Sequence, residues 1–212
     1  MKLSHKYKTD LLTWKRKEHY SFFKNFEQPF FGTTININCT SAYTYCKTYK
    51  IPFYTYYLYQ SLVAVNRVKE FRYRIENDEV FEYESINGSV TVLRKDETFN
   101  FVYFDYQASF SEFKRGLQTA VEEGKNSTGL NLQPVTNLIH YSILTGIPFN
   151  GLQHAQSLSG QDSVPKIVFG QYEIKDGQVF LPVAIHVHHA LCDGFHVARF
   201  IEIFKRQLEI NR

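Results

Sequence analysis

The chain has 212 residues, 43% of them hydrophobic, which is enough for one domain with a substantial core. The formal net charge is +3, and the basic residues are scattered among acidic ones, so no basic stripe is present that would track nucleic acid. No window approaches the roughly 18 uninterrupted apolar residues of a membrane span, and the amino terminus lacks the apolar core of a secretory signal. We therefore expect a soluble, cytoplasmic, single-domain protein over residues 1–212 that binds neither nucleic acid nor a membrane.

Cysteine usage and aromatic content add two expectations. The three cysteines, Cys39, Cys46 and Cys192, are widely spaced and form no Cys-x-x-Cys pair, which suits free thiols in a reducing compartment better than a disulfide framework. The chain also contains 19 Phe and 15 Tyr. So many rings indicate an aromatic core, and they could also line a pocket for an aromatic ligand.

The first part of the chain mixes helical and strand patterns. Apolar spacing predicts a helix over residues 14–27 that ends near Pro29, and the alternation in "FFGTTININ" predicts a strand. A short helix is expected over 41–49. Pro52 lies in the first turn of a longer helix that reaches Lys69. The inward-facing residues of this helix are predicted to be Phe53, Tyr56, Tyr57, Leu62, Val65 and Val68.

The middle of the chain is predicted to be rich in strands. "FRYRIENDEVFEYE" indicates two strands joined at Asn77-Asp78, and a further turn is expected at Asn87-Gly88, with more strands through Tyr106. A helix over 109–123 and a strand at "NLIHYSI" should follow. A long loop is then expected from Gly146 to about Val164, and long loops often carry functional residues.

The last third gives the clearest pattern. "KIVFGQYEIKDGQVFLPVAIHVHH" predicts a hairpin that turns at Asp176-Gly177, and Asp193-Gly194 should turn the chain into a closing amphipathic helix. Strands joined largely by hairpins and intermixed with helices predict an α+β fold. We expect a two-layer sandwich in which a mostly antiparallel mixed β-sheet is covered by helices.

Four of the eight histidines lie in one short segment, "VAIHVHHALCDGFHV", over residues 183–197. A zinc site would need His186 and His188 on one face of a strand plus Asp193 or His196 from the following loop, and the spacing matches no zinc pattern. Cys192 could instead be a nucleophile activated by His189. One histidine could be a general base held at the end of a strand. All four could also be structural histidines with satisfied hydrogen bonds.

The same segment resembles a known family. "HHALCDGFH" resembles the His-His-x-x-x-Asp-Gly active-site signature of the chloramphenicol acetyltransferases, including its continuation. "TWKRKEHYSFF", "KEFRYRI" and "FLPVAIHVHHA" resemble further segments of that family, so the resemblance covers essentially the whole chain. Dihydrolipoamide acyltransferase cores share the shorter part of the signature and the fold, but they usually carry lipoyl domains, which are missing from this sequence. The resemblance implies the chloramphenicol acetyltransferase fold.

The resemblance also implies roles for individual residues. His189 would be the general base that takes the proton of an acceptor hydroxyl, so that the oxygen attacks the thioester of acetyl-CoA directly, without metal or acyl-enzyme. Asp193 would be structural, paired with Arg16, and Cys192 would be a packed thiol. The enzyme would be a homotrimer with its active sites between subunits, and Tyr172 would lie along the CoA channel. The acceptor-binding residues implied by the resemblance are Phe22, Phe23, Phe31 and Phe99.

The sequence departs from the family's pattern in two polar groups of the transition-state site. Gly151 takes the place of a serine and Val168 that of a threonine, while Glu27 adds a carboxylate to a region that is apolar in the family. Asn150 is the best substitute donor for the oxyanion. The sequence thus leaves two functions open: an O-acetyltransferase for chloramphenicol or a related acceptor, or a weakly or non-catalytic trimer that binds a ligand. Other candidates for the missing hydroxyl are Ser142, Ser157 and Ser159.

Overall fold

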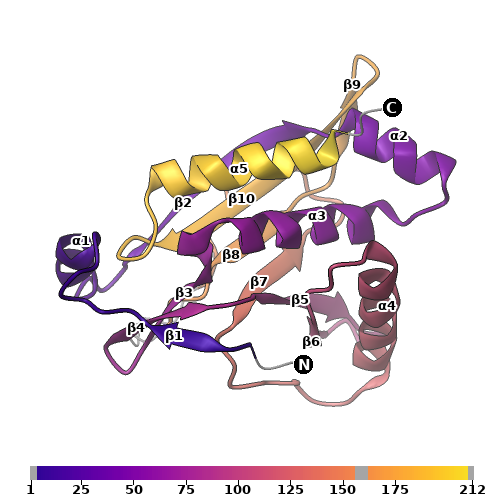
Figure 1. Ribbon diagram of the computed structural model, residues 1–212. Coiled ribbons are helices and arrows are strands. Elements are labelled where there is room, and N and C mark those ends of the chain that lie inside the picture. The colour runs from indigo at the N-terminus through magenta and orange to yellow at the C-terminus, as the bar shows by residue number, and fades with distance from the viewer. Residues whose placement is uncertain (1–3, 156–161, 210–212) are drawn as a thin grey trace.

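The structure is a computed structural model that describes residues 4–155 and 162–209 (Figure 1). The helices are α1 (Lys17–Phe23), α2 (Thr40–Thr48), α3 (Phe53–Arg67), α4 (Phe110–Asn126) and α5 (Gly194–Leu208), with a 3-10 turn, η1, at Lys69–Arg72. The strands are β1 (Lys6–Lys8), β2 (Phe30–Asn38), β3 (Tyr73–Glu76), β4 (Glu79–Tyr83), β5 (Asn87–Leu93), β6 (Phe99–Phe104), β7 (Leu138–Ile143), β8 (Lys166–Phe169), β9 (Glu173–Lys175) and β10 (Gln178–His188). Among the described residues, no helix has both the length and the apolar content to cross a bilayer.

The strands form one large and one small sheet. The large sheet has the order β2-β10-β8-β7-β5-β6, with β9 paired to the start of β10. Among the described strands of this sheet, β5 with β7 and β7 with β8 run parallel, and the other neighbours are antiparallel. The small sheet, β1-β4-β3, is antiparallel throughout. The predicted mixed, mostly antiparallel sheet is therefore confirmed.

The helices α2 to α5 cover one face of the large sheet, which gives the predicted two-layer α+β sandwich (Figure 1). The helix α3 packs against α2, α4 and α5, and every residue from 55 to 65 is buried. Alternate side chains of β10, among them Val183, Ile185 and Val187, join this core. Because strand side chains alternate, His186 and His188 lie on the opposite face, which none of the described helices α2 to α5 covers. The two histidines therefore share one face of the strand, as the alternation of a strand predicts.

Two local predictions are wrong. The first helix is α1, Lys17–Phe23, and is shorter than the predicted 14–27. Before it, Trp14 packs edge-on against Tyr73 at 5.3 Å between ring centroids, and after it, Phe26 packs on Phe23 at 5.1 Å. Asn87 and Gly88 form no turn but lie inside β5. A Cβ atom at Gly88 would collide with the ring of Phe104 on the neighbouring strand, so this glycine serves close packing.

The two other predicted hairpin turns are confirmed. Asn77 and Asp78 join β3 to β4 with positive φ angles of 51° and 61°. Asp176 and Gly177 join β9 to β10 with φ angles of 51° and 74°. Such angles are typical of the two-residue turns that match the twist of a hairpin. The second hairpin starts β10, whose eleven residues run between β2 and β8 to the histidine segment.

Candidate active site

The strand β10 ends at His188, and His189 begins a tight turn into α5. The backbone N–H of His189 donates to the carbonyl oxygen of Pro29 at 2.8 Å, beside the start of β2. Its ring stacks on Phe23 with 4.1 Å between centroids and 8° between planes, and Phe31 lies at 4.5 Å. Nδ1 of His189 is buried without a hydrogen-bond partner among the described residues, which leaves Nε2 as the nitrogen that can meet a substrate.

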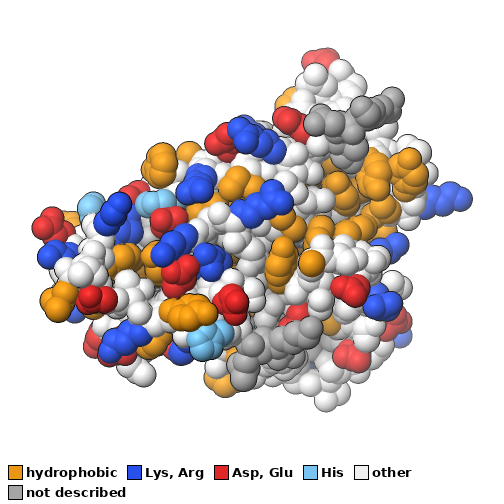
Figure 2. Space-filling model, in the orientation of Figure 1, with side chains coloured by type: hydrophobic (Ala, Val, Ile, Leu, Met, Phe, Trp, Pro, Cys, Tyr) orange, Lys and Arg blue, Asp and Glu red, His pale blue; other side chains and the backbone are white. Residues whose placement is uncertain are grey.

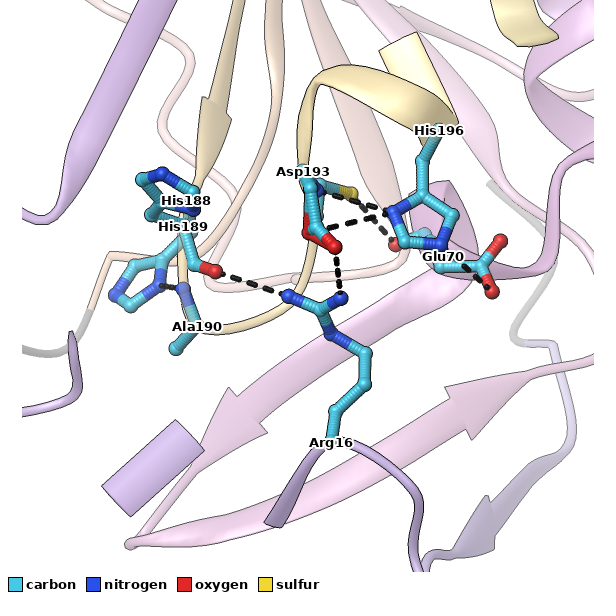
Figure 3. A network of polar contacts seen from close by, with 8 residues as sticks. Arg16, Glu70, His188, His189, Ala190, Asp193 and His196 are labelled. Atoms are coloured by element: carbon cyan, nitrogen blue, oxygen red, sulfur yellow. Dashed lines mark hydrogen bonds and ion pairs between the residues drawn. The ribbon is translucent and has the colours of Figure 1, made fainter. Parts of the chain in front are cut away.

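One guanidinium group holds the turn that follows (Figure 3). Arg16 Nη1 lies 2.6 Å from Asp193 Oδ2, and Arg16 Nη2 donates to the carbonyl oxygen of His189 at 3.1 Å. Burial alone would raise the pKa of Asp193, but the hydrogen bond and charge of Arg16 outweigh burial and hold this pKa below its usual range. The Arg16–Asp193 pair expected from the resemblance is therefore present, and it also fixes the backbone of His189.

The other histidines of the segment have partners of their own. Ala190 N–H donates to His188 Nδ1 at 3.2 Å, and burial lowers the pKa of His188 to about 4, so its ring is neutral near pH 7. Asp193 N–H donates to His196 Nδ1 at 3.0 Å. His186 Nε2 lies 3.0 Å from the carbonyl oxygen of Leu152. Within residues 4–155 and 162–209, no three His, Cys, Asp or Glu side chains gather into a metal-binding group.

Cys192 is fully enclosed beneath this turn. Its Sγ lies 3.3 Å from the carbonyl oxygen of Glu70, and burial raises the pKa of the thiol far above its usual range. A thiol that stays protonated is a poor nucleophile. The geometry therefore disfavours the reading in which Cys192 attacks an acyl group.

Substituting Cys192 tests this point. We expect Cys192→Ser to keep near wild-type turnover, because serine retains a hydrogen-bond donor for the carbonyl oxygen of Glu70. Iodoacetamide should leave the native protein active and label it only after unfolding, which mass spectrometry detects. If iodoacetamide labelled Cys192 in the native protein and abolished turnover, the hypothesis that Cys192 is the nucleophile would be supported after all.

Three of the four predicted acceptor-binding rings gather beside His189. Phe23 and Phe31 touch its ring, and Phe22, whose side chain is 64% exposed, packs on Phe23 at 4.9 Å between centroids. These rings therefore lie on the same wall as His189. Phe99 does not join them, because it lies on β6, at the opposite edge of the sheet from β2.

Tyr172 also lies away from His189. It follows β8 and packs against Tyr43 of α2 and Phe53 of α3, with 3.4 Å between the hydroxyl oxygens of the two tyrosines. Figure 2 shows that hydrophobic side chains gather on the surface over α2 and the adjoining end of α3, where Tyr49 and Tyr54 are exposed. One chain thus carries His189 near one end of β10 and an aromatic surface near the other.

The candidate oxyanion residues line an open cavity of about 870 Å³ on the helix-free side of β2 and β10. Asn150 and Gly151 form part of its wall, together with Phe30, Thr34 and His186. A Cβ atom at Gly151 would meet nothing within 4 Å. The cavity therefore has room for a side chain at this position.

The other residues that the sequence analysis named for the transition-state site lie in separate parts of the chain. Val168 is buried within β8, and Glu27 is exposed to solvent, so its carboxylate bears no burial cost. Ser142 lies in β7 in register with Val168. The other two serines proposed as hydroxyl donors, Ser157 and Ser159, lie outside the described residues.

Two polar pairs near the site were missed by the sequence interpretation. Lys166 is 4% exposed, pairs with Asp162 at 2.6 Å and lies 4.2 Å from the ring centroid of Phe30. His196 Nε2 lies 3.5 Å from Glu70 Oε1. The first had a signal, a lysine opening the apolar strand "KIVF". For the second pair, the sequence indicated only the position of His196, through the three-residue spacing of a capping box between Asp193 and His196. It gave no sign of Glu70.

Comparison with known proteins gives a consistent result. The family model described as "Chloramphenicol acetyltransferase" matches residues 5–205. The chloramphenicol acetyltransferase 2 of Escherichia coli is 31% identical over 199 residues, covering 91% of this chain and 92% of that protein. A solved structure described as chloramphenicol acetyltransferase has a TM-score of 0.86 at 25% identity and covers 97% of this chain and 100% of its own. A probable dihydrolipoamide acetyltransferase from Listeria monocytogenes shares the fold, with a TM-score of 0.65 at 12% identity over 91% of this chain and 88% of its own.

Proposed function

The chain belongs to the chloramphenicol acetyltransferase family, which makes it an acyltransferase, and we propose that it moves acetyl from acetyl-CoA to a hydroxyl of chloramphenicol or a related small acceptor. The observation that carries this proposal is the state of His189. Its ring stacks on Phe23, and its carbonyl oxygen accepts a hydrogen bond from Arg16. A histidine fixed at both ring and backbone can present one nitrogen in one direction, as a general base requires.

The proposed reaction is a direct transfer. His189 Nε2 takes the proton of the acceptor hydroxyl while that oxygen attacks the thioester carbonyl carbon, which forms the new C–O bond. The tetrahedral intermediate then collapses, the C–S bond breaks, and the imidazolium returns its proton to the thiolate of CoA. Asp193 and Arg16 hold the base in place. Acetyl-CoA is a co-substrate, and no step uses a metal.

The acceptor would lie against the three aromatic rings that surround His189, which are those of Phe22, Phe23 and Phe31. Tyr172 would line the path of CoA. Phe99 is 50% exposed at the far edge of the sheet. If Phe99 also lines the acceptor pocket, it must come from another copy of the chain. We therefore propose a homotrimer with active sites between subunits. We also place it in the cytoplasm, since all three cysteines are free and buried.

The trimer has a direct test. Light scattering of the purified protein should give three times the chain mass of 24.9 kDa. A monomer that keeps its full specific activity at high dilution would rule out a site shared between subunits.

The oxyanion should be stabilised by Asn150, whose side-chain amide can donate into the cavity at the position next to Gly151. Removing one preorganised oxyanion donor costs about 100- to 1000-fold in turnover. We expect Asn150→Ala to lower kcat much more than it raises KM, because the interaction is made in the transition state. Unchanged kinetics in this variant would remove Asn150 from the mechanism.

Gly151→Ser should raise the rate with chloramphenicol, because it adds a hydroxyl donor where the Cβ atom has open space and the backbone is unstrained. Gly116→Ser is a matched control, since Gly116 also has open space but lies in α4, away from the site. The control should leave the rate unchanged. An equal response of both variants would show that position 151 has no special role.

A second function is favoured by the lack of a hydroxyl at both Gly151 and Val168: a trimer that binds a ligand with little or no turnover. The two proposals differ in one observable. Release of the CoA thiol from acetyl-CoA, followed over a panel of small alcohols, supports the enzyme if it depends on the acceptor. Ligand binding without thiol release supports the binding protein.

A further inference from the structure

A polar network connects Glu70 in η1 to the backbone of His189 through three intermediate residues (Figure 3). Glu70 Oε1 lies 3.5 Å from His196 Nε2, and His196 Nδ1 accepts the backbone N–H of Asp193 at 3.0 Å. Asp193 Oδ2 pairs with Arg16 Nη1 at 2.6 Å. Arg16 Nη2 completes the path by donating to the carbonyl oxygen of His189 at 3.1 Å. Glu70 and His196 therefore connect to His189 without touching it.

The hydrogen bond to Nδ1 fixes the tautomer of His196. A nitrogen that accepts a backbone N–H carries no proton, so the neutral ring has its proton on Nε2. Nε2 is the nitrogen that faces the Glu70 carboxylate. The side chains of Glu70 and His196 are only 18% and 12% exposed, so the carboxylate acts on Nε2 with little screening by water. Glu70 thus favours the tautomer that Asp193 needs.

The opposite tautomer would disrupt the turn. Asp193 Oδ1 also lies near Nδ1, at 3.6 Å, but the backbone N–H of Asp193 is closer, at 3.0 Å. With the proton on Nδ1, this N–H would face a second donor, and the start of α5 would lose a hydrogen bond. Asp193 is the N-cap residue of α5, so a displaced backbone there would also move its carboxylate away from Arg16. Arg16 would then hold the carbonyl oxygen of His189 less firmly. Small displacements of this kind matter because a catalytic group about 1 Å out of place can cost about 100-fold in rate.

We propose that Glu70 and His196 are positioning residues for the reaction, acting on His189 through Asp193 and Arg16. This inference rests on the proposed function, because it assumes that His189 performs the chemistry. Neither residue contacts the reacting atoms in this arrangement. Their contribution is to keep one tautomer and one backbone conformation at the start of α5.

Paired substitutions at position 196 give the kinetic test. His196→Phe removes the acceptor for Asp193 N–H and should lower kcat about 10- to 100-fold with little change in the KM of acetyl-CoA. His196→Asn places an amide oxygen near the position of Nδ1 and should recover most of kcat. His140→Phe is the matched control, because His140, like His196, is a partly buried histidine whose Nδ1 has a partner, Ser89 Oγ at 2.7 Å. The control should lower the melting temperature and leave kcat near wild type.

Substitutions at Glu70 test the other end of the network. Glu70→Leu should lower kcat in the same way, and Glu70→Gln should recover most of it, because the amide oxygen can still accept from His196 Nε2. A kcat for both His196→Phe and Glu70→Leu within twofold of wild type would overturn the proposal. A fall equal to that of His140→Phe would also overturn it, because a general loss of packing would then explain the effect.

Nitrogen-15 NMR of the histidine side chains gives a readout that needs no activity. The wild-type protein should show His196 as the neutral tautomer with the proton on Nε2. The ring signals of His189 should shift in His196→Phe and Glu70→Leu but not in His140→Phe. A proton on Nδ1 of His196, or unshifted His189 signals, would contradict the positioning role. If wild type releases no thiol with any acceptor, the proposed function fails, and these spectra still decide whether the network positions His189.

Discussion

Replacing His189 with alanine is expected to lower acetyl transfer by at least about 100- to 10,000-fold, the usual contribution of a positioned general base. The variant should keep its fold. The ring of His189 lies against Phe23 and Phe31 at the edge of the core, and losing such aromatic contacts costs only about 0.5 to 1.5 kcal/mol each. Thiol release measures the rate, and thermal unfolding measures the stability.

His5→Ala is the control for this experiment, because His5 is exposed and lies outside the site. It should retain the wild-type rate. If His189→Ala transferred acetyl as fast as His5→Ala, His189 would not be the base, and the catalytic group would have to be sought elsewhere.

Arg16→Ala should lower stability and turnover together, because one guanidinium serves both Asp193 and the backbone of His189. A hydrogen bond to a charged group contributes about 1.5 to 3 kcal/mol. We expect a loss in this range, since the side chain of Asp193 is 35% exposed and water compensates it in part. Denaturant unfolding at neutral pH measures the change.

The stability difference between wild type and Arg16→Ala should depend on pH. The pKa of Asp193 is depressed in the folded protein, so the pair contributes stability above the unfolded pKa of about 3.9. That contribution is lost as the pH falls through the lower, folded value. The difference should therefore be largest near neutral pH and shrink in acid, down to the part due to the carbonyl oxygen of His189, which does not titrate.

Arg16→Lys separates charge from geometry. Lysine keeps the positive charge beside Asp193 but lacks the fork that reaches two acceptors at once. It should therefore recover part of the stability and little of the turnover. Equal melting temperatures and rates for wild type, Arg16→Lys and Arg16→Ala would contradict the role assigned to this pair.

The outline of the fold could be predicted from local sequence signals. Strand alternation placed His186 and His188 on one face of β10, and the turn residues Asp176 and Gly177 located the hairpin before it. The same kind of signal failed at Asn87-Gly88. There the glycine lies under the ring of Phe104 on the next strand, and this packing cannot be read from two neighbouring residues.

The site could be predicted only in part. Arg16 and Asp193 are 177 positions apart, and only the resemblance to a family brought them together. The connection from Glu70 to His196 could not be anticipated, since it depends on η1 packing beneath the start of α5. Likewise, no local pattern distinguishes Phe23, which stacks on His189, from Phe99 at the far edge of the sheet.

The most direct test of acetyl transfer is the initial rate of CoA release by the wild-type protein, with and without chloramphenicol, with the product identified by mass spectrometry. We expect release that depends on the acceptor, together with an O-acetylated product. The rate should be below that of relatives with a serine and a threonine at positions 151 and 168. Thiol release that is absent, or equal with and without chloramphenicol and every other alcohol tried, would contradict O-acetyl transfer and favour the ligand-binding alternative.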